Sequence, residues 1–197
     1  NFFRINMSIM SFNNISIRLK LTLIFVSIVS FSNSYGQSYK GVTGVRDTSY
    51  STKSAFKYDV KIHPSIKIVP EFHFNSVKEK RNITYCEIGK RKLNLDAFLN
   101  TDKTNSKRTA IIIIHGGGWR TGSREQHYPM AQKLASLGYV CFTPEYRLST
   151  EALFPAAIYD IKAVIRWVRE NAAVYNFDPN KITVLGFSAG GEMASFM

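Results

Sequence analysis

The stretch IIIIHGGGWRTG, residues 111–122, joins four isoleucines to a histidine, three glycines and a tryptophan. Isoleucine is stiff about χ1 and favours strands, whereas glycine tolerates backbone conformations that other residues avoid. A continuous apolar run predicts a strand that is buried on both faces, as in a parallel sheet covered by helices. The glycines predict a loop at the end of that strand, with backbone N–H groups that no side chain shields.

Regular structure is expected on both sides of this strand. Strand patterns occur at 83–88, 92–100, 139–147 and 182–187, and helix patterns occur at 128–139, 154–173 and from 188 onward. Apolar residues fill every second position from Leu93 to Leu99, which indicates a strand with one buried face. Gly138 is expected to close the first helix, and Pro155 to begin the second.

The order of these segments indicates the fold class. Strands and helices alternate after the first three strands, which predicts an α/β fold with a mostly parallel sheet and helices on both faces. Ligands bind at the carboxyl ends of the strands in such folds, and both glycine-rich stretches follow such ends. The domain is expected to cover residues 83–197. Residues 37–82 are rich in Ser, Thr, Tyr and Lys and are expected to form a linker or an edge segment.

The second glycine-rich stretch is VLGFSAGGEMA, which contains Gly186-Phe187-Ser188-Ala189-Gly190 between a strand and a helix. This Gly-x-Ser-x-Gly pattern is typical of a sharp turn that holds the serine at a positive φ and lifts its hydroxyl above the sheet. The residues two before and two after the serine approach so closely that neither can carry a side chain. Ser188 is therefore the candidate nucleophile.

The three glycines after His115 suit the other half of acyl-transfer chemistry. Attack on an ester carbonyl makes a tetrahedral intermediate with a negative oxygen, which preorganised N–H donors stabilise. Loss of one such donor typically costs about 3 kcal/mol. The stiff strand would then hold the donors in place, and residues 115–119 would form the oxyanion loop.

These motifs resemble a known family. HGGGW, PEYRLS, FPAAIYDIKAVIRWVRENA and ITVLGFSAGGEMA resemble the α/β-hydrolase esterases, especially the hormone-sensitive-lipase-like and the acetyl-esterase or feruloyl-esterase-like branches. The resemblance extends from Ile83 to Met197 and implies the α/β-hydrolase fold. It implies Ser188 as the nucleophile, Gly117, Gly118 and Ala189 as oxyanion donors, Gly186 and Gly190 as elbow glycines, and His115, Gly116 and Trp119 as support for the oxyanion loop.

A serine nucleophile needs a base, usually a histidine, and an acid that orients the base. In this fold both follow the serine in the chain, whereas all four histidines here precede Ser188. His127 is instead expected in a loop beside the site entrance. Either the polypeptide continues beyond Met197, or the protein is a degenerate hydrolase. Because Met197 falls inside a helix pattern, we expect a C-terminally truncated sequence that holds the N-terminal part of the fold.

Other polar residues have two interpretations. Glu145, Tyr146 and Arg147 follow a strand end, so they either contact the substrate or brace a loop through a salt bridge. Asp160 is expected to pack or to form hydrogen bonds within its helix environment. Glu192, one helical turn beyond the serine, is either solvated or part of the rim of the site.

Composition argues against several classes of function. The chain of 197 residues carries 26 Lys and Arg against 14 Asp and Glu, but the basic residues are scattered rather than gathered in a stripe with aromatics. Nucleic-acid binding is therefore not expected. No Cys or His spacing is typical of a metal site, and neither a metal nor a cofactor is expected. Cys86 and Cys141 lie in apolar strand patterns and are expected to be free thiols.

The N-terminus has the order of a secretory signal. Arg18 and Lys20 precede a short apolar run, and small residues follow it. The run is shorter than the roughly 20 residues that span a membrane. We expect a signal peptide at 1–36, cut between Gly36 and Gln37, which predicts a secreted or periplasmic protein without stable membrane insertion. An uncleaved membrane anchor is the alternative.

Together these observations predict an exported serine esterase that cleaves small acyl esters through an acyl-enzyme on Ser188. The substrate would be a small-molecule or carbohydrate-linked ester, the latter by analogy alone. A serine peptidase of the same fold is one alternative, although peptidase branches seldom use a triple-glycine loop. A non-catalytic relative that binds a ligand is the other, and an acid and a histidine after Ser188 would distinguish the enzyme from it. The oligomeric state is not predicted.

Overall fold

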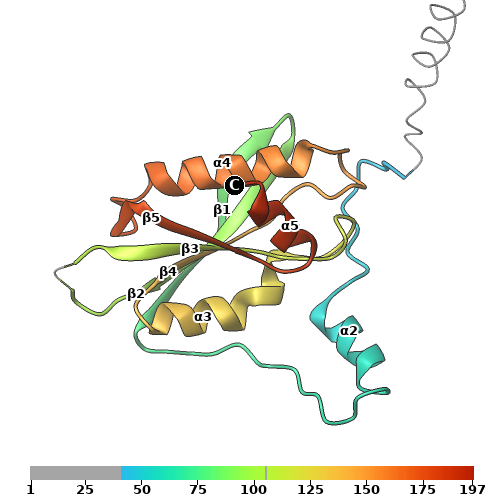
Figure 1. The fold of residues 1–197 in the computed structure, drawn as a ribbon, viewed down its shortest axis with the longest axis horizontal. Helices are drawn as coiled ribbons and strands as arrows, with labels where there is room; N and C mark the ends of the chain where they lie inside the picture. The colour runs from blue at the N-terminus through green and yellow to red at the C-terminus, as the bar shows by residue number, and fades with distance from the viewer. Residues whose placement is uncertain (1–40, 105) are drawn as a thin grey trace, which may run out of the picture. The chain divides into compact units, whose positions relative to one another are not determined.

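The computed structural model describes residues 41–104 and 106–197, so the signal peptide expected at 1–36 and its cleavage site lie outside the described residues. The elements are helix α2 (Thr52–Asp59), strands β1 (Val77–Ile88), β2 (Arg91–Asn100) and β3 (Arg108–Ile114), the 3-10 helix η1 (Arg124–His127), helix α3 (Tyr128–Ser136), strand β4 (Val140–Pro144), helix α4 (Ala156–Glu170), strand β5 (Phe177–Gly186) and helix α5 (Ala189–Ser195). Figure 1 shows their arrangement.

The five strands form one mixed sheet in the order β1-β2-β4-β3-β5. β1 pairs with β2, and β2 with β4, in antiparallel fashion, while β3 runs parallel to both β4 and β5. The chain leaves β3, crosses through α3 to β4, and then returns through α4 to β5 on the other side of β3. A reversal of this kind creates the crevice at the carboxyl ends where α/β folds bind ligands.

Strand β3 contributes side chains to two hydrophobic cores. Ile112 and Ile114 pack in the core that α4 and α5 cover, whereas Ile111 and Ile113 pack in the core that α3 covers. In Figure 1, α4 and α3 accordingly lie on opposite sides of the sheet. Because successive strand residues face opposite sides, a strand covered on both faces must be apolar at every position. The expectation of a doubly covered central strand is confirmed.

Two strands differ from the sequence-based expectation. β1 begins at Val77 rather than at Ile83, because four consecutive charged residues, 78–81, conceal the strand pattern of its first half. In β2 the second face is also buried, since Asp96 and Phe98 are both 0% exposed. The alternation along β2 suggested a solvated polar face, but Asp96 accepts hydrogen bonds from Arg124 and other neighbours that compensate its burial.

The segment DPNK (178–181), whose Asp, Pro and Asn are typical turn residues, lies within the bounds of β5. It sits at a register shift, because Phe177 pairs with Arg108 while Ile182 pairs with Ala110. Such an irregularity accommodates extra residues on one strand. The turn-forming residues therefore mark a bulge inside the strand.

The two cysteines lie on strands that are not neighbours in the sheet. Cys86 is on β1 and Cys141 is on β4, with β2 between them, and both are free thiols. Burial raises the pKa of Cys141 to about 12, which keeps its thiol protonated and unreactive. The expectation of two free thiols is confirmed.

Candidate active site

The two glycine-rich motifs lie side by side because β3 and β5 are neighbours. Ile114, the last residue of β3, pairs with Gly186, the last residue of β5. The N–H of Phe187 donates to the carbonyl of Ile114 at 3.3 Å. A Cβ atom on Gly116 would lie 2.6 Å from the carbonyl oxygen of Phe187 and 3.2 Å from the Cβ of Ser188. The glycine loop, residues 115–119, therefore passes directly against the serine turn, residues 186–190.

The serine turn has the strained geometry that its sequence pattern predicts. Ser188 is exposed and has φ 52° and ψ −123°, outside the regions that non-glycine residues usually adopt. A Cβ on Gly186 would overlap the carbonyl oxygen of Gly190, and a Cβ on Gly190 would overlap that of Ile114. Both positions therefore require glycine, and the tight packing holds the serine in its strained conformation.

The glycine loop is tightly packed at Gly117 and open at Gly118. Gly117, Gly118 and Trp119 all have positive φ, at 125°, 60° and 64°. The carbonyl of Gly117 accepts from the N–H groups of Arg120 and Thr121 at 3.2 and 3.0 Å, which closes the loop into a turn. A Cβ on Gly117 would collide with Thr121, whereas one on Gly118 would meet nothing within 4 Å. The backbone at Gly118 is exposed and borders open space.

His115 lies beneath this loop and is 0% exposed. Its Nδ1 is 2.7 Å from the carbonyl oxygen of Gly116, so this nitrogen carries the proton and donates. Its ring stacks on that of Tyr146 with 4.4 Å between centroids, and the Tyr146 hydroxyl donates to the carbonyl of His115 at 3.0 Å. Burial lowers the pKa of His115 to about 3. His115 is therefore a neutral residue that packs under the loop.

The buried neutral His115 predicts a pH-dependent stability. Below pH 6.5 the unfolded chain binds a proton at this histidine, whereas the folded protein does not until about pH 3. The stabilisation is complete above pH 6.5 and is lost as the pH falls towards 3, by about 1.4 kcal/mol per pH unit. Urea unfolding between pH 7 and 4 should therefore give a shallower loss of stability for His115→Asn than for the wild type. Equal slopes in the two proteins would contradict this expectation.

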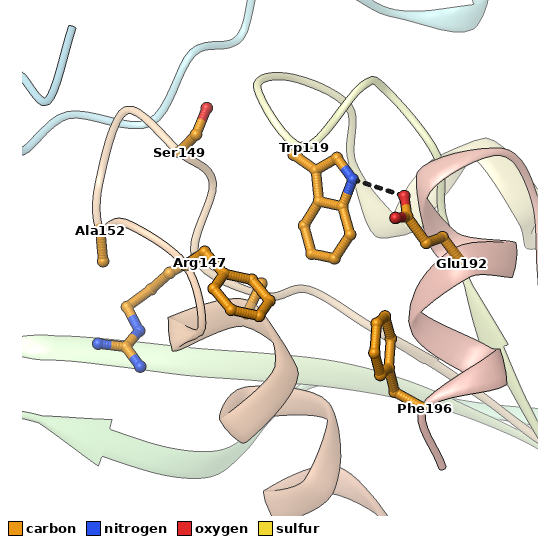
Figure 2. A pocket seen from close by; sticks show the side chains of 8 residues that line it. Trp119, Arg147, Ser149, Ala152, Glu192 and Phe196 are labelled. Atoms are coloured by element: carbon orange, nitrogen blue, oxygen red, sulfur yellow. Dashed lines mark hydrogen bonds between the residues drawn. The ribbon is translucent and has the colours of Figure 1, made fainter. Parts of the chain in front are cut away.

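A pocket of about 300 Å³ opens between Trp119 of the glycine loop, residues 147–157 and residues 192–196. Its walls are Trp119, Arg147, Ser149, Ala152, Phe154, Ala157, Glu192 and Phe196. Figure 2 shows the Trp119 indole and the Phe196 ring facing the same space, with Glu192 at its edge. The Trp119 indole N–H donates to the Glu192 carboxylate at 3.1 Å. Of the two interpretations of Glu192, the geometry supports a rim residue.

The other polar residues brace the structure around this pocket. Arg147 forms a salt bridge with Asp160 at 2.7 Å and also donates its backbone N–H to that carboxylate at 2.9 Å. The hydrogen bonds that the Arg147 guanidinium donates to Asp160 raise the pKa of Arg147. Glu145 lies deeper and pairs with Arg91 and Arg124, each at 3.0 Å. Arg147 borders the pocket while it braces the loop, and Asp160 has the packing and hydrogen-bonding role expected of it.

His127 stacks on Phe187, the residue before the serine, with 4.4 Å between ring centroids. Burial lowers its pKa. The sequence predicted a loop residue beside the site entrance, whereas the structure places His127 at the end of the 3-10 helix η1, against the serine turn. Sequence reasoning missed Arg46, which lies in the segment interpreted as a linker. Its guanidinium donates to the carbonyl of Gly122, three residues after the glycine loop. A lone arginine in a Ser- and Thr-rich segment carries no periodic signal that would have indicated this contact.

Residues 41–104 and 106–197 contain no group of three or more His, Cys, Asp or Glu side chains that could hold a metal ion. Over the same described ranges, every helix is too short or too polar to cross a membrane.

Comparison with known proteins identifies esterases. The chain is 36% identical to esterase LipQ of Mycobacterium tuberculosis over 129 residues, which is 64% of this chain and 30% of LipQ. It is 41% identical to carboxylesterase NlhH of the same species over 88 residues, 44% of this chain and 28% of NlhH. The chain thus spans less than a third of the length of these curated relatives.

The structural comparison agrees. Propionate-bound esterase 2 of the planctomycete Thermogutta terrifontis superposes with a TM-score of 0.54 at 32% identity, covering 61% of this chain and 44% of that protein. The mixed sheet and its helices therefore form part of an α/β-hydrolase fold, as predicted. The model of the BD-FAE family matches residues 95–197, more than half of the chain and all of both glycine-rich motifs. This chain belongs to the BD-FAE family.

Proposed function

We propose that the protein hydrolyses small carboxylic esters through an acyl-enzyme on Ser188. The observation that carries this proposal is the pairing of Ile114 with Gly186, which brings an exposed serine and an open glycine loop together. In the proposed reaction the Ser188 hydroxyl attacks the ester carbonyl, and the N–H groups of Gly117, Gly118 and Ala189 stabilise the negative oxygen. The alcohol then leaves, and water releases the acid from the serine.

The proton of Ser188 needs an acceptor. His115 is a poor candidate because it is fully buried and its Nδ1 donates to the Gly116 carbonyl. In the order typical of this fold, the acid and the histidine follow the serine in the chain. The proposal therefore concerns the protein expressed from its whole gene.

Small acyl groups are the proposed substrates. The pocket between the glycine loop and α5 measures about 300 Å³, and Trp119, Phe154 and Phe196 are among its walls. The related esterase 2 of Thermogutta terrifontis has structures described as propionate-bound and butyrate-bound. Both observations support a site that accommodates short acyl chains attached to a small-molecule or carbohydrate alcohol.

A panel of p-nitrophenyl esters tests this proposal. We expect kcat/KM for the acetate and butyrate to exceed that for the palmitate by at least about tenfold, or about 1.4 kcal/mol in transition-state stabilisation. A preference for palmitate would contradict the proposed substrate class. Saturable ester binding without turnover would instead indicate the non-catalytic binding protein.

We also propose export, with the mature protein starting at Gln37. The charged, apolar and small-residue order of residues 1–36 supports this proposal. N-terminal sequencing or intact mass measurement of the protein from the extracellular or periplasmic fraction should show Gln37 as the first residue. A mature species that retains Arg18 would contradict cleavage at this site.

A further inference from the structure

The segment from Thr43 to Tyr50, which we call the strap, is hydrogen-bonded at both of its ends to residues of the α/β domain. At one end, the N–H groups of Thr43 and Gly44 both donate to the carbonyl of Thr150 at 2.9 Å. At the other end, the N–H of Tyr50 donates to the hydroxyl of Thr121 at 3.2 Å. The strap is thus anchored to Thr121, two residues after Trp119, and to Thr150, whose neighbour Ser149 donates its N–H to the Trp119 carbonyl.

Between these anchors, Arg46 makes two charge-assisted hydrogen bonds to backbone carbonyls. One guanidinium nitrogen donates to the carbonyl of Gly122 at 2.8 Å, and another donates to that of Tyr146 at 3.0 Å. The side chain is only 18% exposed and lies 3.6 Å from the carboxylate of Glu151, which is 7% exposed. A planar guanidinium can bond two acceptors in fixed directions, which a lysine ammonium on a flexible stem does poorly.

Both carbonyls that Arg46 holds belong to residues packed on the start of the glycine loop. Gly122 is buried, and a Cβ there would overlap the carbonyl of Gly116 and lie 2.8 Å from Nδ1 of His115. Tyr146 stacks on the His115 ring and donates its hydroxyl to the His115 carbonyl. A shift of either carbonyl would therefore move the backbone of residues 115 and 116.

We infer that Arg46 is a positioning residue that holds the glycine loop in the geometry that the oxyanion requires. This inference rests on the proposed function, since it assigns Arg46 a role in the same site. Three of the loop residues have positive φ, so the loop conformation depends on its surroundings to persist. Because oxyanion donors act only when preorganised, a displacement of about 1 Å costs on the order of 100-fold in rate.

The test compares Arg46→Ala and Arg46→Lys with a matched control, Arg120→Ala. Arg120 directly follows the oxyanion loop, residues 115–119, and pairs with Asp47 of the strap at 3.6 Å, but its side chain is 64% exposed. An exposed ion pair of this kind contributes little to stability. Each variant of the protein from the whole gene is assayed for kcat, for KM with p-nitrophenyl acetate, and for inhibition by a trifluoromethyl ketone, which forms a tetrahedral adduct with a reactive serine.

We expect Arg46→Ala to lower kcat by about 10- to 100-fold and to weaken inhibition by the trifluoromethyl ketone by a similar factor. KM should change less than about threefold. Arg46→Lys should fall between Arg46→Ala and the wild type, and Arg120→Ala should match the wild type. Unchanged kcat in Arg46→Ala, or a loss in which KM alone rises, would overturn the inference. If Arg46→Ala does not fold, Arg46→Lys decides by the same criteria.

Failure of the proposed function gives a different result. If the protein is not a serine esterase, the wild type does not hydrolyse p-nitrophenyl acetate, or Ser188→Ala hydrolyses it equally well. If only the role of Arg46 is wrong, the wild type is active, Ser188→Ala is inactive and the Arg46 variants retain the wild-type kcat.

Discussion

Ser188→Ala is expected to lower kcat for p-nitrophenyl acetate by about 10⁶, as loss of a nucleophile that works as one unit with its base does in other serine hydrolases. The exposed serine lies next to the open backbone of the glycine loop, and alanine keeps the size of the side chain while it removes the attacking oxygen. Steady-state hydrolysis of p-nitrophenyl acetate by the protein from the whole gene measures the effect.

Ser195→Ala is the matched control for this experiment. Ser195 is an exposed residue of the same helix, and its hydroxyl donates to the carbonyl of Glu192 at 2.6 Å. This variant should retain the wild-type kcat. A Ser188→Ala protein that keeps more than a small fraction of wild-type turnover would show that another residue is the nucleophile.

Gly190→Ala is expected to destabilise the fold by about 3 kcal/mol or more, at the upper end of the range for overpacking. The added methyl group would overlap the carbonyl of Ile114 and lie 2.7 Å from that of His115. These atoms are backbone at the end of a central strand, so they cannot move aside as a flexible side chain would. Urea denaturation followed by circular dichroism gives the free energy of unfolding of the variant and the wild type.

Gly191→Ala provides the control within the same helix. A Cβ at this position would have its closest contact at 3.2 Å, with the carbonyl oxygen of Gly186, so a small adjustment accommodates it. Alanine also favours a helix over glycine by about 1 kcal/mol, and the two effects should leave stability within about 1 kcal/mol of the wild type. Equal stability of the Gly190 and Gly191 variants would refute the argument that close backbone approach requires glycine at 190.

The alternation of strand and helix patterns predicted the fold class, because amphipathic and apolar periodicity is a local property of the chain. The isoleucine run predicted a strand covered on both faces, and the structure places its alternate residues in two separate cores. The Gly-x-Ser-x-Gly pattern predicted the positive φ of Ser188, which the structure shows at 52°. Turn chemistry of this kind depends on a few adjacent residues.

Sequence patterns gave wrong predictions where residues far away in the chain stabilise a residue type that is unfavourable at its own position. Asp96 occupies a position on β2 that the alternation assigned to a polar face. Hydrogen bonds from Asn82, from Tyr128 and from Arg124, 28 residues later, make its burial tolerable. The first half of β1 carries four consecutive charged residues, 78–81, so its pairing with β2 decides that it is a strand. In both cases the deciding interaction joins residues that no sequence window contains.

The sequence by itself determined that this protein has two glycine-rich turns at the ends of buried strands, one with a serine and one with a histidine and tryptophan. Only the tertiary structure decided that the two turns meet, because β5 pairs with β3 after α4 carries the chain back across the sheet. It also decided that Arg46 reaches the loop, 76 residues before Gly122 in the chain. Strand order and long-range hydrogen bonds depend on how whole faces of strands and helices pack against each other. Sequence periodicity indicates which face of an element is apolar, but it does not indicate which other element covers that face.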